Sequence, residues 1–196
     1  MFDISVGSYT DAGDVKQTNQ DCILYKSGRI NHRTVGLFIV ADGCGGLAFG
    51  EEISRLAVTH FNRLWDTDLE KLLEGQKIAD KDINDFLGKA IRDINVSAVD
   101  FGKLVNKKVG TTLSLLLVVD KKYYIKNIGD SRVYLIRRGK ITQLTEDQSL
   151  VANMIRNKEL TKEEAKHFGK KNVLTMCIGL FEDVKTYTKL GRLKPG

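Results

Sequence analysis

Hydrophobic and polar positions alternate along the chain in patterns that predict strands, then two helices, then further strands. The apolar run 34–40, which leads to Asp42, predicts a buried strand that ends in a glycine turn. Apolar residues then recur three or four positions apart at 50–64 and from about 82 to 105. This spacing predicts two helices that each bury one face. The almost wholly apolar run 112–119 predicts a strand that is buried on both faces.

Shorter stretches complete this order of elements. Residues 2–8 alternate loosely and predict an opening strand, while 123–128 and 133–137 predict two strands that follow the buried run. Helices that lie between groups of strands are typical of an α+β fold and not of alternating βαβ units. Residues 151–168 carry a weakly apolar helical pattern with Thr161 as a helix N-cap, which predicts a small surface subdomain.

The composition is that of an ordinary globular protein of about one domain. Hydrophobic residues make up 42% and charged residues 29% of the 196 residues. No apolar stretch approaches the roughly 20 residues that cross a bilayer, and the first residues show no secretory signal, so we expect no membrane span. The three cysteines share no metal-ligand spacing, which fits a cytoplasmic protein without a disulfide framework.

The net charge of +6 comes mostly from the last quarter of the chain. A basic face can attract nucleic acid, an anionic membrane or a phosphorylated protein, but a charge run is most often an ordinary solvated surface. The basic stretch holds only three scattered aromatic residues, Phe168, Phe181 and Tyr187, and shows no interleaved pattern of the kind that a stacking platform for bases requires. We therefore expect no nucleic acid among the partners.

The strongest local signal for chemistry is the segment 41–46, where an aspartate follows the buried strand and glycines come directly after it. Glycines let the backbone approach a ligand closely, and the Asp42 carboxylate with the Gly43 carbonyl offers the hard oxygen atoms that Mg²⁺ or Mn²⁺ prefers. A plain Asp-Gly turn is the ordinary alternative. The segment 43–48 also fits the G-x-G-x-x-A dinucleotide fingerprint. However, Asp42 would repel a pyrophosphate, and no strand ends in an acidic residue about 20 residues further on.

Three further polar segments carry candidate chemistry: the loop 10–21, which ends at Asp21; the turn 127–134, which contains Asp130; and the strand start at 110–112. Each alone is as typical of an ordinary turn as of a site. In this order, and together with the glycine turn, they resemble the metal-dependent protein phosphatases of the 2C type in their bacterial form. The matching segments are Lys16-Gln17-Thr18-Asn19-Gln20-Asp21, Ala41-Asp42-Gly43-Cys44-Gly45-Gly46, Gly110-Thr111-Thr112, Gly129-Asp130-Ser131-Arg132, Leu144-Thr145-Glu146-Asp147-Gln148-Ser149 and Val173-Leu174-Thr175-Met176-Cys177-Ile178-Gly179.

The resemblance covers essentially the whole chain and implies a four-layer αββα sandwich, in which helices flank two antiparallel sheets. It implies one phosphatase domain over 1–196 that is incomplete at its C-terminal end. A flap subdomain at 151–172 would shape access for protein substrates. The resemblance also implies two bound Mn²⁺ or Mg²⁺ ions and a third, weaker cation site.

The resemblance assigns roles residue by residue. Asp42 would bridge both cations, and the Gly43 carbonyl would help to hold one of them. Asp21 would bind directly or through a water molecule, and Asp130 matches the ligand of the third cation. Lys16 stands where the family usually has an arginine that holds the substrate phosphate, so Lys16, Asp21 and Asp42 are the expected catalytic residues.

The implied activity is the hydrolysis of phosphoserine and phosphothreonine in phosphorylated protein substrates by a metal-activated water, with a serine/threonine kinase as the functional counterpart. Some positions depart from the family pattern: Lys16 replaces arginine, Gln20 replaces glutamate, Cys44 replaces methionine and Gln148 replaces histidine. Two later aspartate ligands of the family have no counterpart before Gly196. The alternative interpretation is a catalytically inactive binding or regulatory module of the same type.

Overall fold

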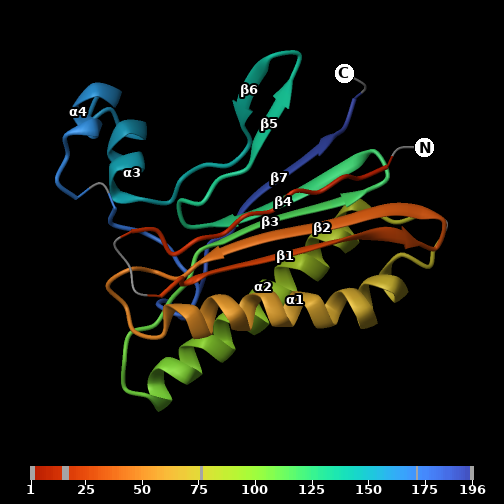
Figure 1. Ribbon diagram of the computed structural model, residues 1–196, viewed down its shortest axis with the longest axis horizontal. Coiled ribbons are helices and arrows are strands. Elements are labelled where there is room, and N and C mark those ends of the chain that lie inside the picture. The colour runs from red at the N-terminus through yellow and green to blue at the C-terminus, as the bar shows by residue number, and fades with distance from the viewer. Residues whose placement is uncertain (1–2, 15–17, 76, 171, 195–196) are drawn as a thin grey trace.

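The computed structural model describes residues 3–14, 18–75, 77–170 and 172–194. Most of its strands form one antiparallel five-stranded sheet in the order β1-β2-β3-β4-β7, with helices packed on one face (Figure 1). These strands are β1 (Asp21–Ile30), β2 (Arg33–Asp42), β3 (Leu113–Val119), β4 (Lys122–Ile128) and β7 (Tyr187–Arg192). A separate hairpin on the other side of the sheet consists of β5 (Tyr134–Arg137) and β6 (Lys140–Gln143).

Two long helices, α1 (Gly50–Leu72) and α2 (Asp80–Leu104), cover one face of the five-stranded sheet (Figure 1). Both confirm the helices predicted from their apolar stripes. α1 extends beyond its predicted end at residue 64 because Leu69 and Leu73 continue the buried stripe. The helix therefore ends only where the buried positions end.

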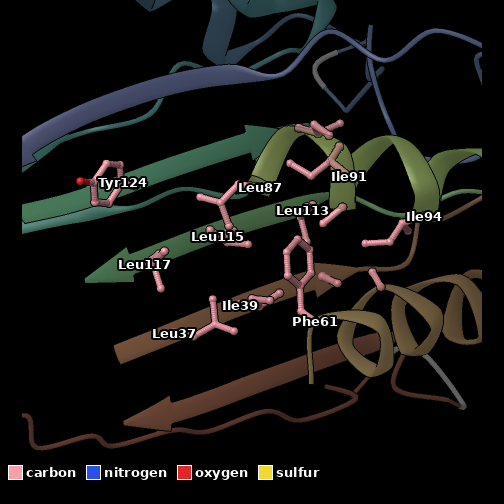
Figure 2. Packing of buried hydrophobic residues seen from close by; sticks show 14 of the residues in the cluster. Leu37, Ile39, Phe61, Leu87, Ile91, Ile94, Leu113, Leu115, Leu117 and Tyr124 are labelled. Atoms are coloured by element: carbon pink, nitrogen blue, oxygen red, sulfur yellow. The ribbon is translucent and has the colours of Figure 1, made fainter. Parts of the chain in front are cut away.

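The hydrophobic core lies between this pair of helices and the sheet (Figure 2). Alternate residues of a strand face the same side, so Leu113, Leu115 and Leu117 of β3 all point toward the helices, and all three are fully buried. Phe61 of α1 and Ile91 of α2 belong to the same buried cluster. Burying one such side chain contributes about 1.5–3 kcal/mol. This layer keeps the strands in register and so determines where their ends lie.

The N-terminal part of the chain differs from its prediction. The expected opening strand at 2–8 is wrong, because residues 3–10 form no strand. Ile4 instead packs against Gly36 of β2, where an added Cβ would meet the Ile4 Cδ1 atom at 2.8 Å. β1 was not predicted, since its polar second half hides the pattern of a strand. It lies at the edge of the sheet. A two-residue turn of Asn31 and His32, both with positive φ, joins it to β2.

The predicted surface subdomain contains two short helices, α3 (Leu150–Arg156) and α4 (Lys162–Lys166), which stand to one side of the sheet (Figure 1). Thr161 is the N-cap of α4, as predicted. Its hydroxyl accepts from the Glu164 N–H, and the Glu164 carboxylate accepts from the Thr161 N–H, so the two residues form a capping box. Neither helix contains a buried residue.

The α+β class and the presence of two antiparallel sheets are confirmed. Over the described part of the chain, the second sheet consists of β5 and β6. The two long helices lie together on the face of the larger sheet that is opposite this hairpin. No helix in the described ranges is long and apolar enough to cross a membrane.

Candidate functional site

Two aspartates lie at neighbouring strand ends on one edge of the sheet. Asp21 begins β1 and Asp42 ends β2, and the strand register pairs them directly. Directly paired residues of an antiparallel ladder point to the same face, with Cβ atoms about 5 Å apart. Both aspartates line a pocket of about 320 Å³, together with Asp11, Asp14 and Gln20. The fold thus brings together two of the residues that were predicted to bind metal.

The loop before β1 is shaped by hydrogen bonds between its own residues. Asp11 Oδ1 accepts from the Gly13 N–H at 2.8 Å, and Asn19 Nδ2 donates to Thr10 Oγ1 at 2.8 Å. Asn19 Oδ1 accepts from the Asp21 N–H at 3.0 Å. These contacts set the direction in which the chain enters β1.

Gly43 occupies a position with no room for a side chain. A Cβ there would lie 2.6 Å from the Gly50 carbonyl carbon and 2.8 Å from Gln20 Cβ. The Gly43 N–H donates to the Gln20 carbonyl at 3.1 Å. Because Gly50 begins α1, the turn after Asp42 is held between the start of that helix and the loop that precedes β1. The Gly43 carbonyl therefore has a fixed place beside Asp42.

Two threonines hold the backbone of Asp42. The Thr112 N–H donates to the Asp42 carbonyl at 2.8 Å, and the Asp42 N–H donates to the Thr112 hydroxyl at 3.1 Å. Thr111 Oγ1 donates to the same carbonyl at 3.0 Å. Both threonines are buried. The sequence marked this pair as part of a motif without indicating that it contacts Asp42.

The turn that carries Asp130 is linked to Asp42 through Thr112. The Thr112 and Ser131 hydroxyls share a hydrogen bond of 2.8 Å. Gly129 has a φ of +97° and packs onto Thr112, where an added Cβ would lie 2.6 Å from Thr112 Cγ2, so only glycine fits. Burial raises the pKa of the Asp130 carboxyl. One buried side chain therefore connects the two segments that were predicted to supply metal ligands.

Gln148 holds the Asp130 turn through the neighbouring Gly129. Gln148 Oε1 accepts from the Gly129 N–H at 2.9 Å, and the Gln148 N–H donates to the Gly129 carbonyl at 2.9 Å. Gln148 Nε2 donates to the Lys185 carbonyl at 2.8 Å. Sequence reasoning missed these contacts and noted Gln148 only as a replacement for histidine.

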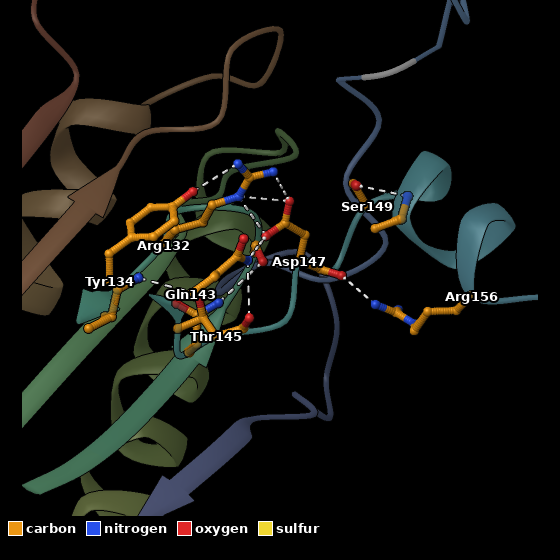
Figure 3. A network of polar contacts seen from close by, with 11 residues as sticks. Arg132, Tyr134, Gln143, Thr145, Asp147, Ser149 and Arg156 are labelled. Atoms are coloured by element: carbon orange, nitrogen blue, oxygen red, sulfur yellow. Dashed lines mark hydrogen bonds and ion pairs between the residues drawn. The ribbon is translucent and has the colours of Figure 1, made fainter. Parts of the chain in front are cut away.

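On the other side of the Asp130 turn, Arg132 and Asp147 form an ion pair (Figure 3). Arg132 Nε donates to the two carboxylate oxygens of Asp147 at 2.8 and 3.0 Å, and Arg132 Nη2 donates to the same carboxylate. Hydrogen bonding to Asp147 raises the pKa of Arg132. Arg156 Nη1 on α3 donates to the Asp147 carbonyl at 3.0 Å. Asp147 thus contacts both the Asp130 turn and the surface subdomain.

Cys44, which follows Gly43, lies against a second buried cysteine. The Cys44 N–H donates to the Gly110 carbonyl at 2.9 Å, and Cys177 Sγ lies 3.0 Å from the place where a Gly110 Cβ would stand. The neighbouring Cys177 side chain and burial raise the pKa of the Cys44 thiol.

The predicted ligands Asp21, Asp42 and Gly43 lie together, and Asp130 is joined to them through Thr112. Lys16 lies outside the described residues. Within the described ranges, no three His, Cys, Asp or Glu side chains gather closely enough to hold a metal ion. The donors that do meet at this edge are carboxylate and carbonyl oxygens, which suit Mg²⁺ or Mn²⁺. Such ions keep several water ligands beside one or two carboxylates.

Comparison with known proteins places the same segments in one family. A family model of protein phosphatase 2C matches residues 12–177. The putative 2C-type protein phosphatase of Streptococcus pyogenes is 33% identical over 189 residues, which are 95% of this chain and 72% of that protein. The crystal structure of the serine/threonine phosphatase Stp1 from Staphylococcus aureus matches with a TM-score of 0.83 at 25% identity, over 98% of this chain and 75% of that one.

A further solved structure contains metal ions. It is the catalytic domain of the serine/threonine protein phosphatase PstP in complex with 2 manganese ions, and it matches with a TM-score of 0.74 at 26% identity. The match covers 96% of this chain and 72% of that chain.

Proposed function

Because the chain belongs to the 2C-type protein phosphatases, we propose that it hydrolyses phosphoserine and phosphothreonine esters in proteins with the aid of divalent cations. The observation that carries this proposal is the direct pairing of Asp21 with Asp42 at the ends of β1 and β2. This pairing supplies two carboxylates at one edge of a rigid sheet, within the segments that carry the family's motifs.

We assign Asp21, Asp42 and the Gly43 carbonyl to two Mn²⁺ or Mg²⁺ ions, and Asp130 to a third, weaker one. The oxygen-only donor set supports this assignment, as does the manganese bound in the PstP structure. Bound divalent cations supply a nucleophilic water at neutral pH and neutralise charge on the phosphoryl group. The protein's part is to fix the ligands in place.

Thr111 and Thr112 carry out that positioning for Asp42. Their three hydrogen bonds hold its N–H and its carbonyl, so the carboxylate projects from a backbone that does not need to rearrange. Groups that are held in position before the reaction stabilise a transition state more effectively than groups that must reorient. The Gly43 turn, packed between Gly50 and Gln20, adds the same rigidity on the other side.

We assign phosphate binding to Lys16, which would act as a point charge and not as a bidentate fork. The flap at 151–172 would contact the protein segment that carries the phosphate. The lack of fully buried residues in α3 and α4 and their position beside the sheet support this role. A serine/threonine kinase would supply the substrates. The cytoplasm fits a chain whose Cys44 and Cys177 are free thiols.

The test is phosphate release from a phosphothreonine peptide, with Mn²⁺ titrated in and EDTA as the blank. Asp42→Asn removes the bridging carboxylate, and we expect kcat/KM to fall by about 100-fold or more. The matched control is Asp68→Asn on the exposed side of α1, about 27 Å along the helix from Gly50 at a rise of about 1.5 Å per residue. It should keep wild-type turnover. Phosphate release that survives EDTA, or that Asp42→Asn leaves unchanged, would overturn the proposal.

A further inference from the structure

We propose that a basic pocket at the end of the sheet opposite to Asp42 binds a small phosphate-bearing anion of the diphosphate class. The pocket has a volume of about 300 Å³. Four cationic side chains line it together with apolar ones, among them Arg33, Lys121, Lys122, Arg192, Ile83 and Val119. The proposal is independent of the phosphatase activity proposed above.

The basic pocket lies at the end of the sheet where β3 turns into β4 (Figure 1). Arg33 begins β2 and Asp42 ends it, so the two residues are about 30 Å apart at a rise of about 3.3 Å per residue. An anion that is bound beside Arg33 therefore does not contact the candidate metal ligands, and its binding can be measured separately from theirs.

The register of the sheet places two of the cations side by side. Lys122 of β4 pairs directly with Arg192 of β7. Directly paired residues have Cβ atoms about 5 Å apart, and like charges at such positions repel each other. Asp80 at the start of α2 accepts from Lys122 Nζ at 2.7 Å. Hydrogen bonds from Lys122 and Tyr124 lower the pKa of Asp80, and the charge of Arg192 lowers it further. One carboxylate therefore serves two cations.

The remaining side chains of the pocket leave an excess of positive charge. Arg33 Nη1 donates to Asp120 Oδ2 at 3.3 Å. Lys121 and Arg192 make no direct ion pair and no side-chain hydrogen bond within the described ranges. The carboxylates of Asp80 and Asp120 thus face four cations. An anion with two or more negative charges balances this excess and relieves the repulsion between the paired cations.

Backbone hydrogen bonds hold the turn between β3 and β4 that forms one side of the pocket. The Thr34 N–H donates to Asp120 Oδ1 at 3.0 Å, and the Asp120 N–H donates to the Thr34 carbonyl at 2.7 Å. The Leu193 N–H donates to the Lys121 carbonyl at 2.7 Å, which joins the end of β7 to this turn. The cations therefore extend from a backbone that is already in place before a ligand binds.

The donor groups of the pocket favour phosphate. A lysine ammonium has three N–H donors, and Lys122 uses one of them in its ion pair. A guanidinium presents its N–H groups in one plane, which matches two oxygen atoms of a phosphate. Ile83 and Val119 give the pocket a buried apolar wall, beside which charges attract each other more strongly than in open water. A diphosphate can contact the paired cations and Lys121 together.

The experiment measures the binding of inorganic pyrophosphate to the whole chain by isothermal titration calorimetry, with EDTA present to remove divalent cations. Wild type is compared with Arg192→Gln and Lys121→Gln. The matched control is Arg138→Gln, because Arg138 is exposed at the turn between β5 and β6 on the other side of the sheet. We expect each pocket variant to bind about tenfold more weakly or worse, since it loses a hydrogen bond between charged groups. The control should bind as wild type does.

Amide chemical shifts in isotope-labelled protein locate the bound anion. Pyrophosphate should shift the amide signals of Lys121 and Lys122 and leave those of Asp42 and Gly43 in place. Thermal melts give a second reading of the same site. Because Arg192→Gln removes one of two repelling charges, the variant without ligand should melt no lower than wild type. Pyrophosphate should raise the Tm of wild type more than that of the variant, since a ligand stabilises the folded state that binds it.

Pyrophosphate binding that both pocket variants leave unchanged overturns the proposal. An equal loss of affinity in Arg138→Gln does so too, because it shows a diffuse attraction to the net charge. Shifts confined to Asp42 and Gly43 place the anion at the candidate metal site and also overturn it. Sulfate that binds as tightly as pyrophosphate overturns the diphosphate class. These measurements use neither a divalent cation nor a phosphatase substrate, so a failure of the proposed function leaves their outcome unchanged.

Discussion

Replacing Thr112 with valine removes one hydroxyl group and keeps the shape of the side chain. That hydroxyl accepts from the Asp42 N–H at 3.1 Å and shares a bond of 2.8 Å with Ser131 Oγ. The methyl group that packs against Gly129 stays in place in valine. The variant therefore tests whether Thr112 holds the two candidate metal-ligand segments together, with little change in packing.

The expected size of the effect follows from the burial of the Thr112 hydroxyl. Thr112 retains 2% of its surface, and the loss of one partner in a buried hydrogen bond costs about 1–3 kcal/mol. Ser131 is partly exposed and can turn toward water, so the bond to Asp42 dominates. We expect the free energy of unfolding to fall by about 1–3 kcal/mol. We also expect the Mn²⁺ concentration for half-maximal activity to rise about tenfold, which corresponds to about 1.4 kcal/mol.

The assays are urea unfolding followed by circular dichroism and a Mn²⁺ activation curve with p-nitrophenyl phosphate. Thr112→Ser is the control, because serine keeps the hydroxyl and loses only the methyl group that contacts Gly129. The serine variant should lose about 0.8 kcal/mol of stability for the missing methyl group and keep the wild-type Mn²⁺ curve. If the valine variant has the wild-type Mn²⁺ curve and the serine variant does not, packing and not hydrogen bonding holds the site.

Three further predictions concern stability. Leu115→Ala removes a fully buried side chain between β3 and the helices, and in a urea titration it should lower the free energy of unfolding by about 2–5 kcal/mol. Hydrogen bonds from Lys122 and Tyr124 lower the pKa of Asp80. Their contribution is therefore present above the ordinary aspartate pKa of about 3.9 and is lost as the pH falls through the lowered value. In thermal melts across this pH range, Asp80→Asn should lose less stability on acidification than wild type. Asp147→Asn removes the ion pair shown in Figure 3, which is partly exposed, and should lower Tm by about 2–4 °C in a thermal melt.

The elements that could be predicted are those in which a single period runs through a buried segment. The stripes of α1 and α2 and the apolar run of β3 face the same core, so local pattern and tertiary packing agree. β1 could not be found in this way, because an edge strand is held by its neighbour and its turn and can keep polar residues along half its length. Residues 3–10 show the reverse case, since a weak alternation there forms no strand and Ile4 packs on Gly36 instead.

The candidate site likewise contains residues that could be predicted from the sequence and residues that could not. Asp42 and Gly43 could be identified because a buried strand that runs into glycines is a local signal. The pairing of Asp21 with Asp42 depends on the register of two strands, which no local pattern encodes. The hydrogen bonds that hold these segments also join residues distant in sequence. Thr112 bonds to Asp42 across 70 positions, and Gln148 bonds to Gly129 across 19. Contacts of that separation exist only once the sheet has formed.

We have assigned the divalent cations that the reaction needs to the ends of β1 and β2. The most direct measurement is Mn²⁺ binding, followed by the electron paramagnetic resonance signal of the free ion, in wild type, Asp21→Asn, Asp42→Asn and the control Asp68→Asn. The paired carboxylates predict that Asp42→Asn weakens binding most, by at least about tenfold, that Asp21→Asn weakens it less, and that the control binds as wild type does. Wild-type binding of Mn²⁺ by Asp42→Asn would contradict the assignment of the cations to these strand ends.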